Sequence, residues 1–186
     1  MIYNYKEIIS KYKTNYKLNK AIKDKKIFKI DTGLYSENEF INYLLVLNKK
    51  YPNAVFTSDS AYYYHNLTDI IPQYYFLATH RKAAKITNNK VKQIYVPEDK
   101  LKLGITTIKV NGTSIKIYDK EKMLIELIKN NKKIPFDYYK EIINNYRLIS
   151  NKIDMNKLSS YLGYYKNNID IFLKIQKEVF WWICKS

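Results

Sequence analysis

The sequence predicts an α+β protein in which a helical module ending in a β-hairpin precedes a mixed, mainly β unit and a helical C-terminal region. Three observations predict this order: helical apolar spacing near the N-terminus, alternating apolar segments separated by turn residues from 54 to 118, and renewed helical spacing after Asp119. The sequence KKYPN at 49–53 interrupts the pattern. We therefore expect one domain at 1–50 and a second at 51–186.

Two short helices are predicted first. One carries apolar residues with the spacing of a single helical face: Tyr5, Ile8, Ile9 and Tyr12. Thr14 or Asn15 can cap the other, in which an apolar stripe lies opposite a basic and aromatic face. The inward residues are Leu18, Ala21 and Ile22, and the outward residues are Tyr16, Lys20 and Lys23.

The segment KIFKIDTGLYS at 26–36 then predicts a hairpin. Phe28 and Ile30 alternate with Lys29, and a glycine ends the expected three-residue loop Asp31-Thr32-Gly33. Two helices followed by a hairpin match the order of a winged helix-turn-helix, in which a helix enters the major groove of DNA and the wing follows the backbone. The DNA contacts expected from this pattern are Tyr16, Lys20, Lys23, Lys26, Lys29 and Thr32. An ordinary solvated lysine face is the alternative.

The rest of the chain predicts strands first and helices afterwards. Ser36 and Glu39 form a capping box before a buried helix, FINYLLVLN. Strands are expected at 54–57, 74–79, 93–96, 106–110 and 114–118, with a short helix, DSAYYYHN, capped by Ser58 and a turn at Asn111-Gly112. Helices are expected at 120–130, 137–147, 155–162 (closed by Gly163) and 168–182.

Composition limits the class of protein. Hydrophobic residues make up 46% of the 186 residues, which excludes wholesale disorder, and no apolar run reaches the roughly 18 residues of a membrane span. The N-terminus lacks the apolar segment of a secretory signal, and Cys184 is the only cysteine, so no internal disulfide can form. We expect a cytoplasmic protein.

Basic charge is concentrated at the front of the chain. The net charge is +16, and residues 1–30 hold nine lysines against Glu7 and Asp24, for a net charge of +7. Such an excess points to a polyanionic partner, either nucleic acid or an anionic membrane surface. The abundance of Lys, Asn, Ile and Tyr also fits A/T-rich codons, so codon bias is an alternative source of the lysines.

Residues that could carry chemistry are few. Two histidines and one cysteine are too scattered for a zinc site, and four isolated glycines form no phosphate-cradling loop. His65 is expected to be a packed or capping side chain, and Tyr62 to Tyr64, Tyr74 and Tyr75 to be core and rim. The enzyme alternative is a metal-dependent nuclease using PEDK at 97–100 or YDKEK at 118–122, although Asp119 is more simply a helix cap. We expect no catalytic residue, no metal and no cofactor.

Three segments resemble one known family. YKTNYKLNKAIKDKKIFKIDTGLYS (12–36) resembles an N-terminal winged helix that ends in a Gly-x-Tyr wing. VFTSDSAYYYHNLTDIIP (55–72) is similar to a strand, a helix containing alanine and tyrosine, and a following LTD…P, and IKIYDKEKMLIELIKN (115–130) looks like a strand-then-helix segment. The family is AbiEi, the antitoxin of the abortive-infection AbiE (type IV) toxin–antitoxin system.

The resemblance implies a DNA-binding autorepressor that counters a cognate nucleotidyltransferase-like toxin in phage defence, without forming a stable complex with it. It implies double-stranded operator DNA as the partner, no membrane and no catalysis. The contacts that it implies lie in 12–36: Lys13, Asn15, Lys17, Lys20 and Lys23 on the helix side, and Lys29, Gly33 and Tyr35 on the wing. The alternatives are the nuclease and a protein-interaction module whose charge reflects codon bias.

Overall fold

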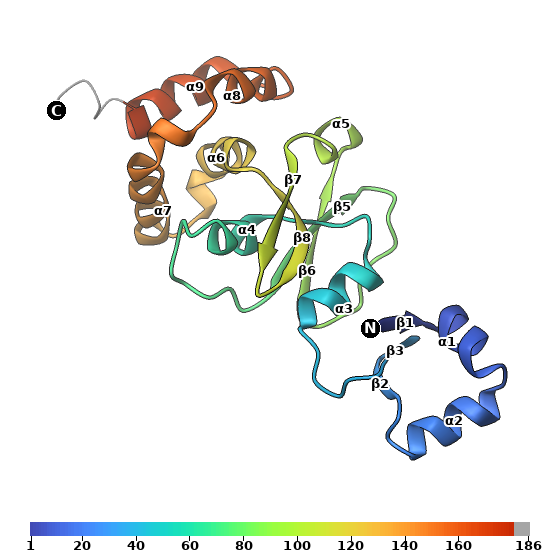
Figure 1. The fold of residues 1–186 in the computed structure, drawn as a ribbon. Helices are drawn as coiled ribbons and strands as arrows, with labels where there is room; N and C mark the ends of the chain where they lie inside the picture. The colour runs from blue at the N-terminus through green and yellow to red at the C-terminus, as the bar shows by residue number, and fades with distance from the viewer. Residues whose placement is uncertain (181–186) are drawn as a thin grey trace. The chain divides into compact units, whose positions relative to one another are not determined.

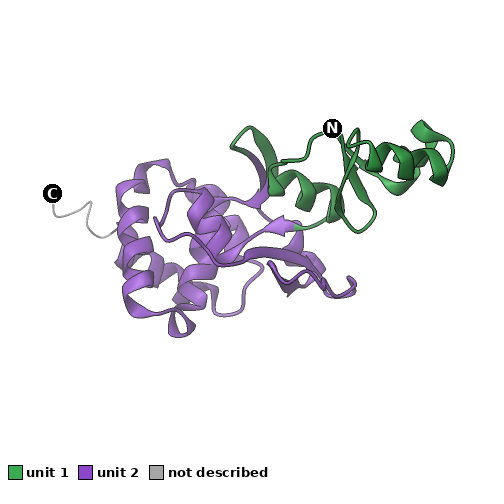
Figure 2. Cartoon of the chain, turned by 90° about the horizontal axis from the view of Figure 1, so that it is seen from below, with its two compact units in different colours: residues 1–54, 109–115 green, residues 55–108, 116–186 purple. Residues whose placement is uncertain are grey.

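The computed structural model describes residues 1–180 and has a mixed α+β architecture (Figure 1). Figure 2 shows two compact units: the first comprises residues 1–54 and 109–115, and the second comprises residues 55–108 and the chain from Lys116 onward. The domain boundary expected after residue 50 therefore lies inside the first unit. Among residues 1–180, no helix is both long enough and apolar enough to cross a membrane.

The first unit contains a three-stranded antiparallel sheet and three helices. In chain order these are β1 (Ile2–Asn4), α1 (Tyr5–Tyr12), α2 (Asn15–Lys23), β2 (Phe28–Asp31), β3 (Leu34–Ser36) and α3 (Tyr43–Lys50). β3 is the central strand of the order β1-β3-β2. Both N-terminal helices and the hairpin are confirmed. No sequence pattern predicted β1, because three residues are too few to show alternation and only pairing with β3 defines the strand.

The core of this unit joins the two helices to the hairpin. Its buried members are Ile8, Leu18, Ala21, Ile27 and Tyr35. They come from the inward stripes of α1 and α2, from the segment before β2, and from β3. The apolar spacing therefore predicted correctly which faces of the helices are buried.

The hairpin loop is shorter than expected. Asp31 pairs directly with Leu34, so the loop consists of Thr32 and Gly33 alone, and a register shift between Lys29 and Asp31 takes up the odd residue. Gly33 has φ +71°, as the prediction of a positive-φ glycine required. Two-residue loops match the twist of a hairpin, which favours this arrangement.

The helix predicted from a capping box at Ser36 begins later than expected. Ser36 is fully buried and pairs with both β1 and β2, so it ends a strand and does not cap a helix. Residues 37–42 form no helix, and Asn42 caps α3 by accepting a hydrogen bond from the Leu44 amide at 3.0 Å. Sheet pairing thus overrides the local capping signal.

The tip of the second hairpin belongs to the first unit. The Asn42 amide donates to the Thr113 hydroxyl at 3.1 Å, and the Asn48 amide donates to the Ser114 carbonyl at 2.7 Å. Asn111 and Gly112 have φ values of +47° and +77°, which confirms the predicted turn. These side-chain bonds, which no sequence pattern indicated, place residues 109–115 with the N-terminal unit.

A mixed five-stranded sheet of order β6-β5-β4-β8-β7 forms the centre of the second unit. β4 pairs antiparallel with β5 and parallel with β8, and β5 pairs parallel with β6. All five predicted strands are present, with ends shifted by one or two residues: β4 (Val55–Phe56), β5 (Tyr75–His80), β6 (Val91–Val96), β7 (Ile105–Val110) and β8 (Thr113–Tyr118). The alternation of apolar residues therefore located the sheet correctly.

Helices surround one central helix of this unit, α6. Its residues Leu124, Ile125 and Leu127 are fully buried, and it contacts α4, α8 and α9, which Figure 1 shows beside it. The helical segments are α4 (Ser58–Tyr64), α5 (Glu98–Leu101), α6 (Lys120–Lys129), α7 (Phe136–Leu148), α8 (Met155–Leu162), α9 (Asn168–Ile175), the 3-10 turns η1 (Asn131–Lys133) and η2 (Ser150–Lys152), and the π-helical η3 (Gln176–Phe180). The predicted helix end at Trp181 and Trp182, and Cys184, lie outside the described residues.

Candidate functional site

The outward face of α2 carries the predicted contacts. Tyr16, Lys20 and Lys23 stand at i, i+4 and i+7, which places them in one row, and all three are exposed, with Tyr16 77% accessible. Lys17 is exposed beside this row. Because Leu18 and Ala21 anchor the opposite face in the core, the helix is held with its basic row toward solvent.

Polar contacts at its N-terminus position α2. The Thr14 hydroxyl accepts a hydrogen bond from the Lys17 amide at 3.2 Å and caps the helix. The Tyr5 hydroxyl of α1 donates to the Asn15 side-chain oxygen at 2.8 Å. Lys13 lies between the helices in the left-handed conformation, with φ +65°. Asn15 therefore joins the two helices, and its side-chain oxygen is already occupied.

The hairpin presents a second group of predicted contacts. Lys26, Lys29 and Thr32 are exposed. Asp31 lies just before the loop, where its carboxylate accepts from the Thr32 amide at 2.6 Å and pairs with the Lys50 ammonium at 2.7 Å. Partial burial opposes ionisation of Asp31, but its hydrogen bonds to Lys50 and to the Thr32 amide lower its pKa overall. The ion pair neutralises the one acidic group of the hairpin and attaches the hairpin to α3.

The lysines of the first unit fall into two groups. Lys11, Lys49 and Lys50 pair with Glu37, Glu7 and Asp31 at 2.5 to 2.7 Å. In contrast, the exposed lysines of α2 and the hairpin form no ion pair with any residue that the structure describes; they are Lys17, Lys20, Lys23, Lys26 and Lys29. Their charges are therefore balanced only by mobile counterions, which a polyanion would displace.

Tyr35 does not belong to the exposed set. It is only 8% accessible and is a member of the core with Ile8 and Leu18. In this core it packs with residues of both α1 and α2. Tyr35 therefore supports the fold, and we remove it from the predicted DNA contacts. Gly33 has no side chain and offers only its backbone.

In the second unit, two of the acidic residues considered for a nuclease, Asp119 and Glu121, serve as structural acceptors. The Asp119 carboxylate accepts from the Lys122 amide at 3.0 Å, which caps α6 as predicted, and from the Tyr161 hydroxyl at 2.9 Å. Glu121 accepts from the Asp154 amide at 2.9 Å. Within residues 1–180, no three His, Cys, Asp or Glu side chains are grouped so that they could hold a metal ion.

His65 also has a packing role, as expected. It ends α4, and its Nε2 lies 2.7 Å from the Tyr118 carbonyl oxygen. Burial lowers its pKa, which favours the neutral ring. Tyr62 is buried, while its neighbours Tyr63 and Tyr64 are partly buried.

Sequence reasoning considered Lys122 only as part of YDKEK and missed its burial. This lysine is 1% accessible and lines a large cavity of the second unit. A signal was present in the sequence: Lys122, Glu126 and Lys129 recur at i, i+4 and i+7, and the other residues between 122 and 129 are apolar. A polar row on a buried helix must face either solvent or an internal space.

No model of a known protein family matches the sequence, and no curated protein matches it. Two groups of basic residues stand out: the exposed lysines of α2 and the hairpin, and the buried Lys122.

Proposed function

We propose that this protein is a DNA-binding autorepressor and antitoxin. The observation that supports DNA binding best is the row of Tyr16, Lys20 and Lys23 on α2, exposed and without ion pairs to described residues, next in sequence to a hairpin with two exposed lysines. Lysines in this state release counterions when they meet phosphates, and this release is the main source of affinity for DNA.

The N-terminal elements suit a winged helix-turn-helix of reduced size. The usual motif has three helices before the wing, whereas here β1 and two helices precede it. In this proposal α2 enters the major groove, and the β2–β3 hairpin lies along the backbone as the wing. Lysine makes point contacts with phosphates more readily than bidentate contacts with bases, so we expect phosphate contacts to dominate the affinity.

The antitoxin role rests on the resemblance of three segments to AbiEi proteins. Under this proposal the second unit counters a nucleotidyltransferase-like toxin encoded beside this gene, without a stable complex, as part of phage defence. Repression would then depend on the first unit, and protection from the toxin would depend on the second. The variant Lys20→Ala/Lys23→Ala should lose repression yet still protect cells that express the neighbouring toxin, and loss of both activities together would contradict the division.

DNA binding is tested by fluorescence anisotropy with the full chain. A duplex from the region upstream of the gene is compared with a scrambled duplex of the same composition, at two salt concentrations. We expect a preference of about a hundredfold, which is about 2.7 kcal/mol. Lys20→Ala/Lys23→Ala should lose this preference while remaining folded, because alanine favours helix.

The matched control replaces two exposed lysines of the second unit, Lys152→Ala/Lys157→Ala, which removes the same charge elsewhere. This control should bind the upstream duplex as the wild type does. If both duplexes bind equally and neither double variant changes the affinity, the proposal is wrong and codon bias accounts for the lysines. If both double variants weaken binding equally, general charge and not the α2 face holds the DNA.

A further inference from the structure

The second unit contains a cavity of about 1130 Å³. One wall is the part of the sheet where β5 and β6 pair in parallel, with Phe76 opposite Lys92 in the register. The polar row of α6 forms another wall, and the start of α7 closes one end. Pockets that hold cofactor-sized ligands are commonly about 300 to 1000 Å³, so this space is large enough for such a ligand.

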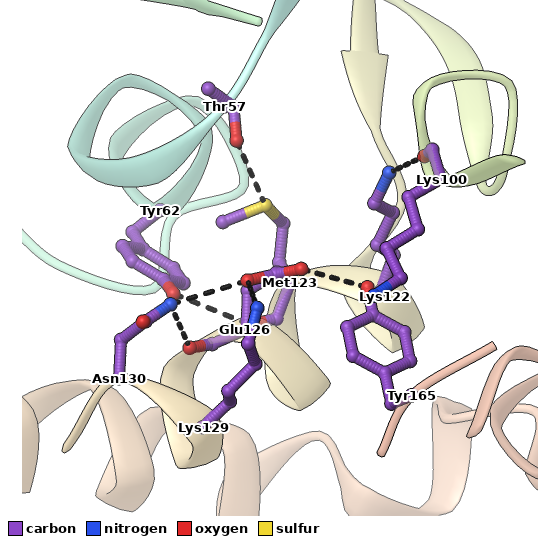
Figure 3. A network of polar contacts seen from close by, with 9 residues as sticks. All are labelled: Thr57, Tyr62, Lys100, Lys122, Met123, Glu126, Lys129, Asn130 and Tyr165. Carbon is purple, nitrogen blue, oxygen red and sulfur yellow. Dashed lines mark hydrogen bonds and ion pairs between the residues drawn. The ribbon is translucent and has the colours of Figure 1, made fainter. Parts of the chain in front are cut away.

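Lys122 is the most unusual residue of the cavity. Its ammonium donates to the Lys100 carbonyl, as Figure 3 shows, and lies 3.3 Å from the centroid of the Tyr118 ring. It forms no ion pair with any residue in the described part of the chain. A buried ammonium ordinarily needs a carboxylate to offset its loss of hydration, so its charge is only partly compensated here.

The pKa of Lys122 reflects the incomplete compensation of its charge. Burial, the largest cause, lowers it from its ordinary value to about 7, and the charges of Lys100 and Lys129 lower it further, while Glu126 and Asp119 act in the opposite direction. Lys122 is therefore close to losing its proton at neutral pH. An anion placed beside it would restore the charged form.

Other cations line the same space. They are Arg81, Lys92, Lys100, Lys129 and Lys133, against three carboxylates, those of Asp59, Glu126 and Asp137. Among these cations, the ion pair that the described residues contain is Lys129 with Glu126 at 3.4 Å. Glu126 is shared further, since it accepts from the Tyr165 hydroxyl at 2.8 Å and from the Asn130 amide at 3.2 Å (Figure 3). The cavity therefore carries an excess of positive charge.

Aromatic rings lie next to these cations. Tyr74, just before β5, and Phe76, within it, line the sheet wall, and the Lys92 ammonium lies 4.4 Å and 5.7 Å from their ring centroids. Aromatic rings of this kind attract cations, and they also bind flat heterocycles by stacking. Tyr95 and Pro97 of the same region add apolar lining.

The wall also contains the buried hydroxyl of Tyr138. Burial raises the pKa of Tyr138, and so does the neighbouring Asp59 carboxylate, with which the hydroxyl interacts. Buried polar atoms are nearly always paired in folded proteins. The Asp59 carboxylate is the partner of the Tyr138 hydroxyl in this wall.

We propose that this cavity binds a nucleotide, with its phosphates against Lys122 and the neighbouring lysines and its base against the aromatic side chains of the β5–β6 wall. Several anionic oxygens attached to a flat ring match this combination of cations and rings. In this site lysine side chains would bind the phosphates. A glycine-rich loop that binds them through its backbone is not available, since no glycine lines the cavity among the residues described. It is independent of DNA binding because all lining residues belong to the second unit.

The proposal is tested by isothermal titration calorimetry of the full chain with ATP, pyrophosphate and adenosine, in the absence of DNA. We expect one site for ATP, with pyrophosphate and adenosine each bound at least roughly tenfold more weakly, about 1.4 kcal/mol. Lys122→Met and Lys92→Gln should each weaken ATP binding by about tenfold or more. Because Lys92 is exposed, its replacement keeps the test decisive even if Lys122→Met fails to fold.

Two controls separate this site from the basic face of the first unit. Lys152→Gln, an exposed lysine away from the cavity, and Lys20→Ala/Lys23→Ala should both bind ATP as the wild type does. Titrations above neutral pH in buffers of different ionisation enthalpy should show proton uptake by the wild type, and none by Lys122→Met, because the anion favours charged Lys122.

Several results would overturn the proposal. These are no ATP binding at millimolar concentration, ATP binding that neither cavity variant changes, and ATP binding that disappears in Lys20→Ala/Lys23→Ala. Pyrophosphate binding as tight as that of ATP would overturn recognition of the base and leave only an anion site.

Discussion

The ammonium nitrogen of Lys122 lies 3.3 Å from the centroid of the Tyr118 ring, at the point where β8 passes into α6. The two residues are four positions apart and both are buried. Between them Asp119 caps the helix, so the cap fixes the direction in which Lys122 leaves the backbone. A ring face and a carbonyl oxygen thus stabilise a charge that would otherwise need a carboxylate.

This burial should make stability depend on pH. The pKa of Lys122 is about 7 in the folded state and about 10.4 in an unfolded chain, so the unfolded state binds more protons between these values. The free energy of unfolding should therefore rise as pH increases from about 7 to about 9.5, below the range where tyrosines titrate. Urea unfolding followed by circular dichroism should show this rise, on the order of a few kcal/mol, and a flatter profile for Lys122→Met. Parallel profiles would contradict the assignment.

Gly104→Ala should destabilise the second unit strongly. Gly104 has φ +66°, and a Cβ there would lie 2.8 Å from an Asp119 carboxylate oxygen and 2.9 Å from the Lys122 Cβ. The substitution adds a clash at the α6 cap to the backbone strain, so we expect a loss of at least about 3 kcal/mol. The control is Gly112→Ala, where φ is +77° but the space is open, and where strain alone should cost about 1 kcal/mol. Equal losses in chemical denaturation would disprove the close approach.

Substitutions of Asp119 should reveal a cap and not a catalytic group. Asp119→Ala removes the acceptor for the Lys122 amide and the Tyr161 hydroxyl, so it should lower the free energy of unfolding by about 1 to 3 kcal/mol. Asp119→Asn keeps an acceptor oxygen and should restore most of this stability. In a nuclease assay with Mg²⁺ or Mn²⁺, a wild-type activity that both variants abolish would support the alternative reading.

The salt dependence of DNA affinity should show which lysines contact phosphates, one substitution at a time. For the upstream duplex, log K should fall linearly with log salt, with a slope of about −0.9 for each phosphate contacted. Replacing the wing residue Lys29 by alanine should reduce that slope by about one and weaken binding to all duplexes to a similar degree. Lys49→Ala is the control, because this lysine pairs with Glu7, and it should leave the slope unchanged.

Tyr35→Phe should leave DNA affinity within about twofold of the wild type, because the ring belongs to the core and is not free to contact DNA. Tyr35→Ala, in contrast, should unfold the first unit by leaving a cavity, with a cost of about 3 to 5 kcal/mol. Anisotropy titrations and thermal unfolding measure the two effects. A large loss of affinity in Tyr35→Phe, with normal stability, would return Tyr35 to the contact surface.

Local patterns in the sequence were sufficient to predict those elements whose apolar residues repeat with the period of a helix or a strand. The inward stripe of α2, the five strands of the second sheet and the Asp119 cap were all predicted, because each depends on residues a few positions apart. The exposed lysine row of α2 follows from the same spacing, since a face opposite a buried stripe must lie toward solvent.

Features that depend on distant residues were not predictable in this way. β1 exists only because β3 pairs with it. Ser36 ends a strand because it pairs with both β1 and β2. Tyr35 is buried because α1 and α2 cover that face of β3. In each case a contact across the chain outweighs the local preference.

By itself, the sequence determined the fold class, the order of most of the elements and the basic face of α2, since periodicity and charge are local properties of the chain. Only the tertiary structure decided that Lys122 is buried in a cavity and that Lys50 neutralises Asp31. The physical reason is that hydration, and with it the state of a charge, depends on which distant segments surround a side chain.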